Sequence, residues 1–139
     1  MKKVVFLLLS GVFMISCTTM KNSQTNIKDV LLAGEWVLQD ENGTVNSYNG
    51  QPISMNFTEE DGLRASGFAG CNRYFAGVNI VGATIQFEQA GSTMMACPEM
   101  DSESAFLKQL PLINTYEVSG NELRFYNNKI LLLKFKRAG

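Results

Sequence analysis

The strongest constraint on the fold is a repeated alternation of apolar and polar residues with a period of two, interrupted by short turn-forming segments. In residues 53–57, for example, Ile53, Met55 and Phe57 fall on one face of an extended strand. Glycine, asparagine and aspartate separate successive segments of this kind, as expected for tight turns between antiparallel strands. Strands are predicted over residues 35–38, 53–57, 63–67, 76–81, 84–87, 116–119, 122–126 and 130–137.

One segment has helical periodicity instead. Met100, Phe106, Leu107 and Leu110 recur at spacings that share one face of a helix, and Pro111 disfavours helical geometry at the residue before it. The apolar face of this helix must be covered by a sheet. We therefore predict an α+β fold: a strongly curved antiparallel sheet, a half-barrel, of seven or eight strands with one helix packed against it.

The last predicted strand, residues 130–137, is apolar on both faces. Leu131, Leu133 and Phe135 fall on one face, and Ile130 and Leu132 fall on the other. We expect both faces of this strand to be covered, one of them by the helix.

The first 17 residues are organised like the signal of an exported lipoprotein. Lys2 and Lys3 precede 12 mostly apolar residues, 4–15, and the segment ends at Ser16 and Cys17. A helix of that length spans only about 18 Å, against a hydrocarbon core of roughly 30 Å, so it is too short to cross a bilayer. We predict a signal peptide over residues 1–16, lipidation of Cys17, and a lipid-anchored location in the cell envelope, facing the periplasm. An ordinary cleaved signal with an unmodified cysteine is the alternative.

Cleavage after residue 16 would leave 123 residues, enough for one domain. We predict a flexible tether over residues 17–31 and a single domain over residues 32–137. The mature chain would carry 10 basic and 13 acidic residues, a net charge of −3. This balance argues against nucleic acid as a partner.

The chain contains no histidine, which removes the commonest general base and the commonest metal ligand in proteins. Glu99, Asp101 and Glu103 lie around the predicted helix start, where the helix dipole by itself favours acidic residues. We therefore predict that the protein is not an enzyme and holds no cofactor.

Two glycine-led loops stand apart from the strand pattern. The loop at residues 67–75 contains GCNRY, and the loop at residues 91–98 contains TMMAC. This pair of motifs resembles the META domain family, also called HslJ-like, and the resemblance extends over about residues 32–135. It implies an envelope lipoprotein with a mixed β fold and a loose association with stress tolerance, without implying a substrate.

Cys71 and Cys97 are the two cysteines that remain when Cys17 is lipidated. An even pair in an oxidising compartment predicts a disulfide. Two alternatives stay open: the two thiols are buried apart as small apolar groups, or they bind Cu(I) together with Met94 or Met95. Adjacent methionines in a strand point to opposite faces, so at most one of them would join such a site, and we predict no metal site.

The candidate binding residues are Asn72, Arg73, Ser92, Thr93 and Met94. An arginine with hydroxyl groups beside it can hold a carboxylate, a phosphate or a sugar. Alternatively, Asn72 caps the turn and Arg73 pairs with a neighbouring carboxylate. We predict a non-enzymatic binding or structural role in the envelope, with another envelope protein as partner. A small-molecule or peptide binder that uses these loops, and an inhibitor-like module, are the alternatives.

Overall fold

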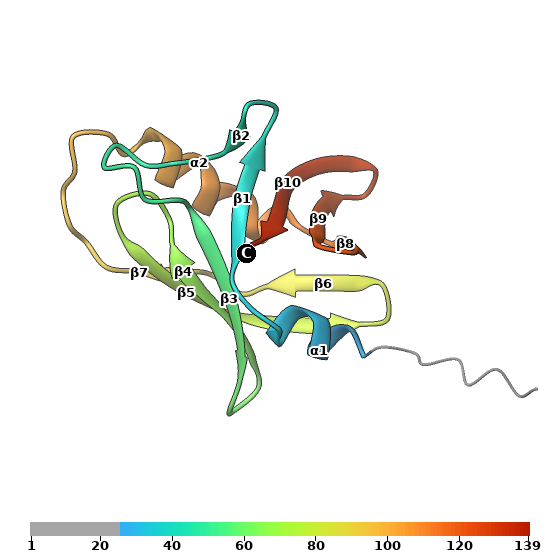
Figure 1. Cartoon of the computed structure of the whole chain (residues 1–139). Coiled ribbons are helices and arrows are strands. Elements are labelled where there is room, and N and C mark those ends of the chain that lie inside the picture. The colour runs from blue at the N-terminus through green and yellow to red at the C-terminus, as the bar shows by residue number, and fades with distance from the viewer. Residues whose placement is uncertain (1–25) are drawn as a thin grey trace, which may run out of the picture.

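The computed structural model describes residues 26–139 (Figure 1). Within these residues the chain forms ten strands, two α-helices and one 3-10 turn. The helical elements are α1 (Ile27–Leu32), α2 (Asp101–Gln109) and the 3-10 turn η1 (Leu110–Leu112). The strands are β1 (Trp36–Asp40), β2 (Gly43–Thr44), β3 (Ser54–Glu59), β4 (Leu63–Phe68), β5 (Arg73–Val81), β6 (Thr84–Phe87), β7 (Gly91–Ser92), β8 (Thr115–Ser119), β9 (Glu122–Asn127) and β10 (Ile130–Arg137).

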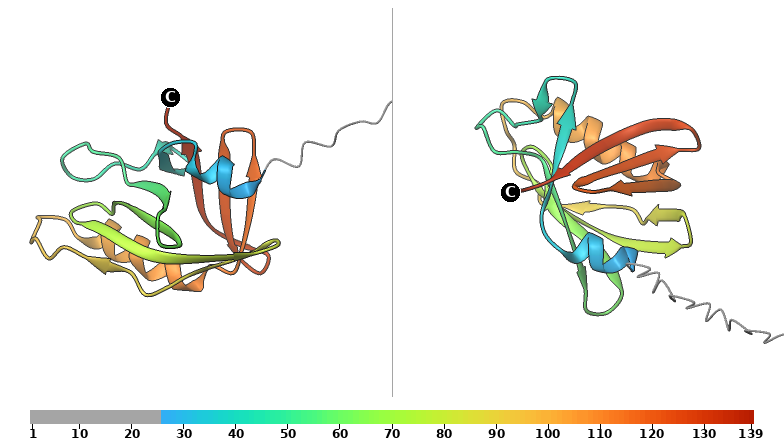
Figure 2. Two further views of the ribbon diagram at one scale, coloured as in Figure 1. Left: turned by 90° about the horizontal axis from the view of Figure 1, so that it is seen from below. Right: turned by 45° about the vertical axis from the view of Figure 1, so that its right-hand side comes forward.

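The strands form one curved antiparallel sheet, as Figure 2 shows from two sides. Their order is β10-β9-β8-β6-β5-β4-β3-β1-β2, with β7 paired to β5. A further pairing of β1 with β10 joins the two sides of the sheet into a ring. The shortest pairing between neighbouring strands is that of β6 with β8, which consists of a single residue pair, Thr84 and Thr115.

The α+β fold and the curved antiparallel sheet predicted from the sequence are confirmed, and each of the eight predicted segments forms a strand. The two additional strands, β2 and β7, have only two residues each. Two residues are too few to show an alternation, so the sequence pattern could not reveal these strands.

The inner face of the ring holds the core, and α2 packs against it. The ring of Phe106 lies edge-on to those of Tyr74 and Phe135, with centroids 5.2 and 6.3 Å away. Phe106 and Leu110 are buried, as their helical spacing predicted. The core residues of this face come from strands far apart in the sequence: Trp36, Leu38, Met55, Phe57, Ala65, Tyr74, Ile85, Phe87, Leu123, Phe125, Leu133 and Phe135.

Our expectation that both faces of the last strand are covered is wrong. Ile130 and Leu131 are 69% and 48% exposed. A register shift between Leu131 and Leu133 breaks the alternation, so Leu131 does not share the buried face of Leu133 and Phe135. The helix covers that same inner face through Phe135, not the outer face.

The predicted tether extends too far, because α1 lies within its last residues. The side chain of Asn26 accepts a hydrogen bond from the backbone N–H of Lys28, at 3.1 Å, and caps the helix. Leu31 is fully buried, and its carbonyl accepts a hydrogen bond from Nε1 of Trp36 at 3.1 Å. Six residues are too short for a visible helical period. The domain therefore begins before residue 32.

The predicted signal peptide and Cys17 lie outside the described residues. Within residues 26–139, neither helix combines the length and the apolar character needed to cross a membrane.

Candidate functional site

A disulfide joins the two glycine-led loops. Cys71 and Cys97 are bonded, with their Cα atoms 5.9 Å apart and a sequence separation of 26. That Cα distance is ordinary for a disulfide. The bond confirms the predicted pairing, and it removes both thiolates from the alternative Cu(I) site.

Asn72 ties the second loop to the first through its side chain. Its Oδ1 accepts hydrogen bonds from the backbone N–H of Met95 at 2.7 Å and from the hydroxyl of Thr93 at 2.9 Å. Its Nδ2 donates to the carbonyl oxygen of Met95 at 3.1 Å. Asn72 is 1% exposed, so these contacts within the protein occupy the side chain. The side chain of Asn72 therefore bonds the second loop, whereas the sequence predicted that it either contacts a ligand or caps its own turn.

Glu103, in the first turn of α2, holds the first loop from the other side. Its Oε2 accepts hydrogen bonds from the backbone N–H groups of Cys71 and Asn72, at 2.8 and 2.5 Å. Its Oε1 accepts a third from Nδ2 of Asn72 at 2.8 Å. Glycine suits position 70 in this loop, because its φ is +134° and a Cβ there would lie 3.3 Å from the backbone nitrogen of Glu103.

We call Cys71, Asn72, Cys97 and Glu103 the loop clamp. Our sequence interpretation missed Glu103, because the helix dipole was a sufficient reason for an acid at that position. A signal was present, since Glu103 precedes the buried Phe106 by three residues and Leu110 by seven, which places it on the apolar side of α2. A carboxylate at such a position needs hydrogen-bond partners when it is buried.

The polar candidate residues differ in whether their side chains form contacts within the protein. Thr93 is engaged, because its hydroxyl donates to Asn72 and accepts from the backbone N–H of Arg73 at 3.2 Å. Ser92 lies in β7 opposite Tyr74 and is exposed. Arg73 is also exposed, and it forms no ion pair with any residue between 26 and 139. The predicted polar site thus has two of its side chains already occupied within the protein.

Three methionines line a shallow hollow next to the clamp, whose Asn72 and Glu103 also line it. Met94 is 96% exposed, Met95 60% and Met100 37%, and with Ala96 they line a hollow of about 260 Å³. We call Met94, Met95 and Met100 the methionine surface. The backbone N–H and carbonyl of Met95 are both bonded to Asn72, so the clamp fixes the base of a surface whose side chains face solvent.

The strands beneath the clamp are closely packed. The hydroxyl of Tyr74 donates a hydrogen bond to the carbonyl oxygen of Ser54 at 3.1 Å, and burial raises the pKa of Tyr74 above its ordinary value. Gly67 lets the carbonyl oxygen of Ser54 lie close to the backbone of β4, because a Cβ at position 67 would lie 2.1 Å from that oxygen. The first loop therefore starts from a rigid part of the sheet.

The two clamped loops and the surrounding fold match a known family. The model of the META domain matches residues 29–139. The chain belongs to the META domain family. The match begins inside α1, in agreement with a domain that includes this helix.

Two solved structures share the fold of this META domain. A protein from Burkholderia xenovorans, solved by NMR, is 26% identical with a TM-score of 0.62, over 80% of this chain and 86% of that one. A second NMR structure is 18% identical with a TM-score of 0.60, over 79% and 93% of the two chains, and at that identity the likeness shows the fold alone. No curated protein matches this chain.

Proposed function

We propose that this META-domain protein is a lipid-anchored component of the cell envelope that acts by binding another envelope protein, not by catalysis. The observation that carries the proposal is the methionine surface: Met94 is 96% exposed and Met95 60% exposed on a loop whose base the clamp holds in place. Apolar side chains gathered on an exposed surface are typical of protein interaction sites.

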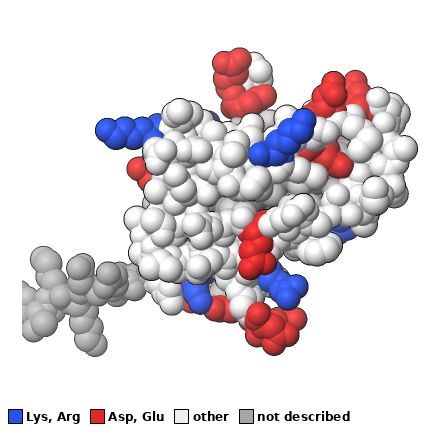
Figure 3. Space-filling model, turned by 180° about the vertical axis from the view of Figure 1, so that it is seen from behind, with Lys and Arg blue, Asp and Glu red and all other residues white. Residues whose placement is uncertain are grey.

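Both the chemistry and the rigidity of the loop suit this role. Methionine side chains are flexible and polarisable, so they adapt to the shape of a partner. A backbone that is already fixed loses little conformational entropy on binding. Charged residues of both signs are dispersed over the face shown in Figure 3, without a single-sign patch that would favour a strongly charged partner there.

The position of the loop suits an anchor at the N-terminus. Figures 1 and 2 show α1, where the described chain begins, well away from the loop between β7 and α2. The eight residues between Cys17 and Asn26 can span at most about 30 Å. A lipid on Cys17 would keep the α1 side of the domain near the membrane and leave the methionine surface accessible to a partner.

The lipid anchor is tested by a Cys17→Ser variant expressed beside the wild type. We expect intact-mass measurement of the wild type to give a chain that starts at Cys17 and carries fatty acid, and fractionation to place it with membranes. The variant should lack the fatty acid and leave the membrane fraction. Wild-type protein that keeps residues 1–16 and carries no lipid would contradict the proposal.

The contact surface is tested by photo-crosslinking in intact cells. A photoreactive amino acid replaces Met94, and the matched control replaces Val81, which is 68% exposed in β5 at the β5–β6 turn. We expect a discrete protein adduct from position 94 and none from position 81. The same adducts from both positions, or none from either, would contradict a specific contact at the methionine surface.

The association with stress tolerance stays a prediction. A deletion strain should grow less well than the wild type under heat or envelope-damaging agents, and the intact gene should restore growth. Restoration by the Cys17→Ser variant to the same level would argue that anchoring is not needed for this role.

A further inference from the structure

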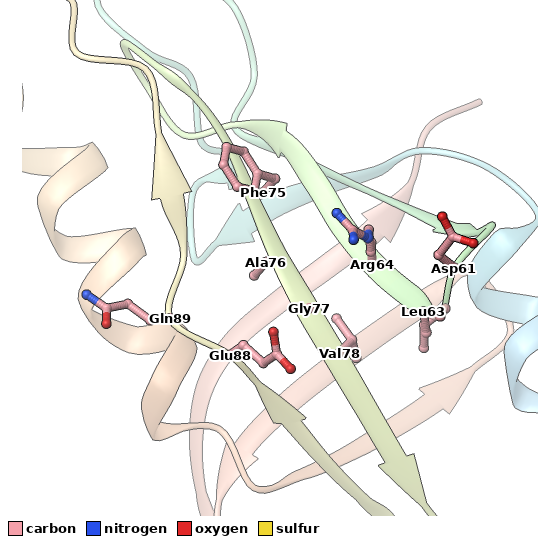
Figure 4. A pocket seen from close by; sticks show the side chains of 10 residues that line it. Asp61, Leu63, Arg64, Phe75, Ala76, Gly77, Val78, Glu88 and Gln89 are labelled. Atoms are coloured by element: carbon pink, nitrogen blue, oxygen red, sulfur yellow. The ribbon is translucent and has the colours of Figure 1, made fainter.

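A second hollow lies on the outer face of the sheet and shares no residue with the methionine surface. It measures about 340 Å³ and lies over β4 and β5 (Figure 4). Its lining includes three charged residues, an aromatic residue and a glycine: Asp61, Arg64, Glu88, Phe75 and Gly77.

Gly77 makes the floor of this hollow. It lies inside β5, opposite Arg64 of β4, and its carbonyl accepts a hydrogen bond from the backbone N–H of Glu88 at 2.9 Å. Glycine weakens the interior of a strand, and it often marks a place where a ligand or another backbone approaches closely. A Cβ at position 77 would lie 2.3 Å from Oε2 of Glu88, so the carboxylate occupies the space that any other residue would fill.

Two opposite charges flank this glycine. Figure 4 shows Arg64 on one side of Gly77 and Glu88 on the other. Across three neighbouring strand positions their Cα atoms are about 10 Å apart, and the carboxylate of Glu88 lies over Gly77. Neither side chain forms an ion pair with any residue that the structure describes. Asp61 adds a second carboxylate at the rim, so the lining carries one positive and two negative charges.

Phe75 supplies an apolar wall beside the charges. It lies two residues before Gly77 on the same face of β5 and is 60% exposed. Its ring covers Gly91, where a Cβ would lie 2.5 Å from Cζ of the ring. The hollow therefore offers a cation, an anion and an aromatic ring within one open space.

We propose that this hollow, which we call the Gly77 notch, binds a small zwitterion, of which an α-amino acid with an apolar side chain is the simplest form. The guanidinium of Arg64 pairs with the ligand's carboxylate, for which its fork geometry is suited, and the carboxylate of Glu88 pairs with the ammonium. The ligand's side chain packs on Phe75. Since the notch is open to solvent, the expected dissociation constant is on the order of 1 mM.

NMR titration of the full-length, ¹⁵N-labelled protein in detergent micelles tests this proposal with three probes. L-leucine carries both charges, N-acetyl-L-leucine only the carboxylate, and L-leucinamide only the ammonium. We expect leucine to shift the amide resonances of Arg64, Gly77 and Glu88, with an affinity about 5-fold higher than that of either derivative, equivalent to about 1 kcal/mol.

Two variants assign the charges, since both residues are exposed. Glu88→Gln keeps the side-chain shape, and Arg64→Gln removes the positive charge with a shorter polar side chain. Arg64→Gln should weaken leucine and N-acetyl-leucine and leave leucinamide unchanged. Glu88→Gln should weaken leucine and leucinamide and leave N-acetyl-leucine unchanged. Lys129→Gln and Glu41→Gln, at exposed positions outside the notch, are the matched controls and should change none of the three affinities.

Three results would overturn the proposal. The first is the absence of any shift at Gly77 up to about 50 mM leucine, well above the expected dissociation constant. The second is equal binding of leucine and its two derivatives. The third is a loss in Arg64→Gln or Glu88→Gln that affects all three probes alike. None of these results bears on the methionine surface, which the crosslinking experiment tests separately.

Discussion

Replacing Glu103 with glutamine tests the loop clamp with almost no change in shape. The carboxylate accepts three hydrogen bonds through two oxygens, whereas an amide has only one acceptor atom. If the amide oxygen keeps the two backbone N–H groups, the new NH₂ faces Nδ2 of Asn72, which is also a donor. Asn72 cannot turn over to match, because its Oδ1 already accepts from Met95 and Thr93.

The size of the effect follows from the bonds that change. A hydrogen bond to a charged group contributes about 1.5–3 kcal/mol, and one between neutral groups about 1 kcal/mol. The variant loses one bond and converts two to neutral ones, which at the low end of these values is a loss of about 2.5 kcal/mol. The neutral side chain is also less costly to bury, which offsets part of this loss. We expect the free energy of unfolding to fall by about 2 kcal/mol, a large share of the 5–15 kcal/mol typical of a domain.

Urea unfolding followed by the fluorescence of Trp36 measures this change. Trp36 is the single tryptophan of the chain and is fully buried, so its emission reports the loss of the core. Glu99→Gln is the matched control: Glu99 is exposed near the same helix start, and its replacement should change stability by less than about 0.5 kcal/mol. If Glu103→Gln unfolds at the same urea concentration as Glu99→Gln, with equal slopes, the carboxylate of Glu103 does not stabilise the fold through these three hydrogen bonds.

Three further predictions concern the same part of the fold. Replacing both Cys71 and Cys97 with serine should lower the free energy of unfolding by about 3.5 kcal/mol in the chain-entropy model, and thiol labelling of the native protein should find neither cysteine reactive. Burial raises the pKa of Tyr74, so above about pH 10 the unfolded chain loses a proton that the native state keeps. The free energy of unfolding, measured with urea, should therefore fall as the pH rises above about 10. Tyr74→Phe should reduce the slope of this fall. Gly67→Ala should lower the thermal midpoint strongly, with a cost of about 3 kcal/mol or more, because its Cβ would lie 2.1 Å from the carbonyl oxygen of Ser54.

Period-two alternation predicts the strands of this protein well because most of them bury one face only. Trp36 and Leu38, for example, are buried in β1 while the residues between and after them are not. The alternation fails in β10, where a register shift after Leu131 changes which side chains face the core. Such a shift depends on how the strand pairs with β9, and the sequence of β10 by itself does not contain that information.

The candidate site was predictable in its cysteines and only partly in its polar residues. Cys71 and Cys97 are identified by count, since they are the pair that remains after Cys17. The role of Asn72 is decided by Met95 and Thr93, which lie more than 20 positions away and reach it only through the pairing of β5 with β7. A local motif cannot tell an asparagine that binds a ligand from one that binds the next loop.

The polar part of the clamp does what the disulfide alone cannot. A single covalent link between Cys71 and Cys97 fixes one distance, and the pairing of β5 with β7 fixes only the start of the second loop. The side chain of Asn72 forms hydrogen bonds with both the N–H and the carbonyl of Met95, and Glu103 orients Asn72 from the helix side. These bonds fix the direction of the second loop as well. Burying a carboxylate is costly, and an apolar residue could fill the same space. The network therefore sets the shape of the loop as well as contributing to stability, and the residue whose backbone it holds, Met95, belongs to the methionine surface.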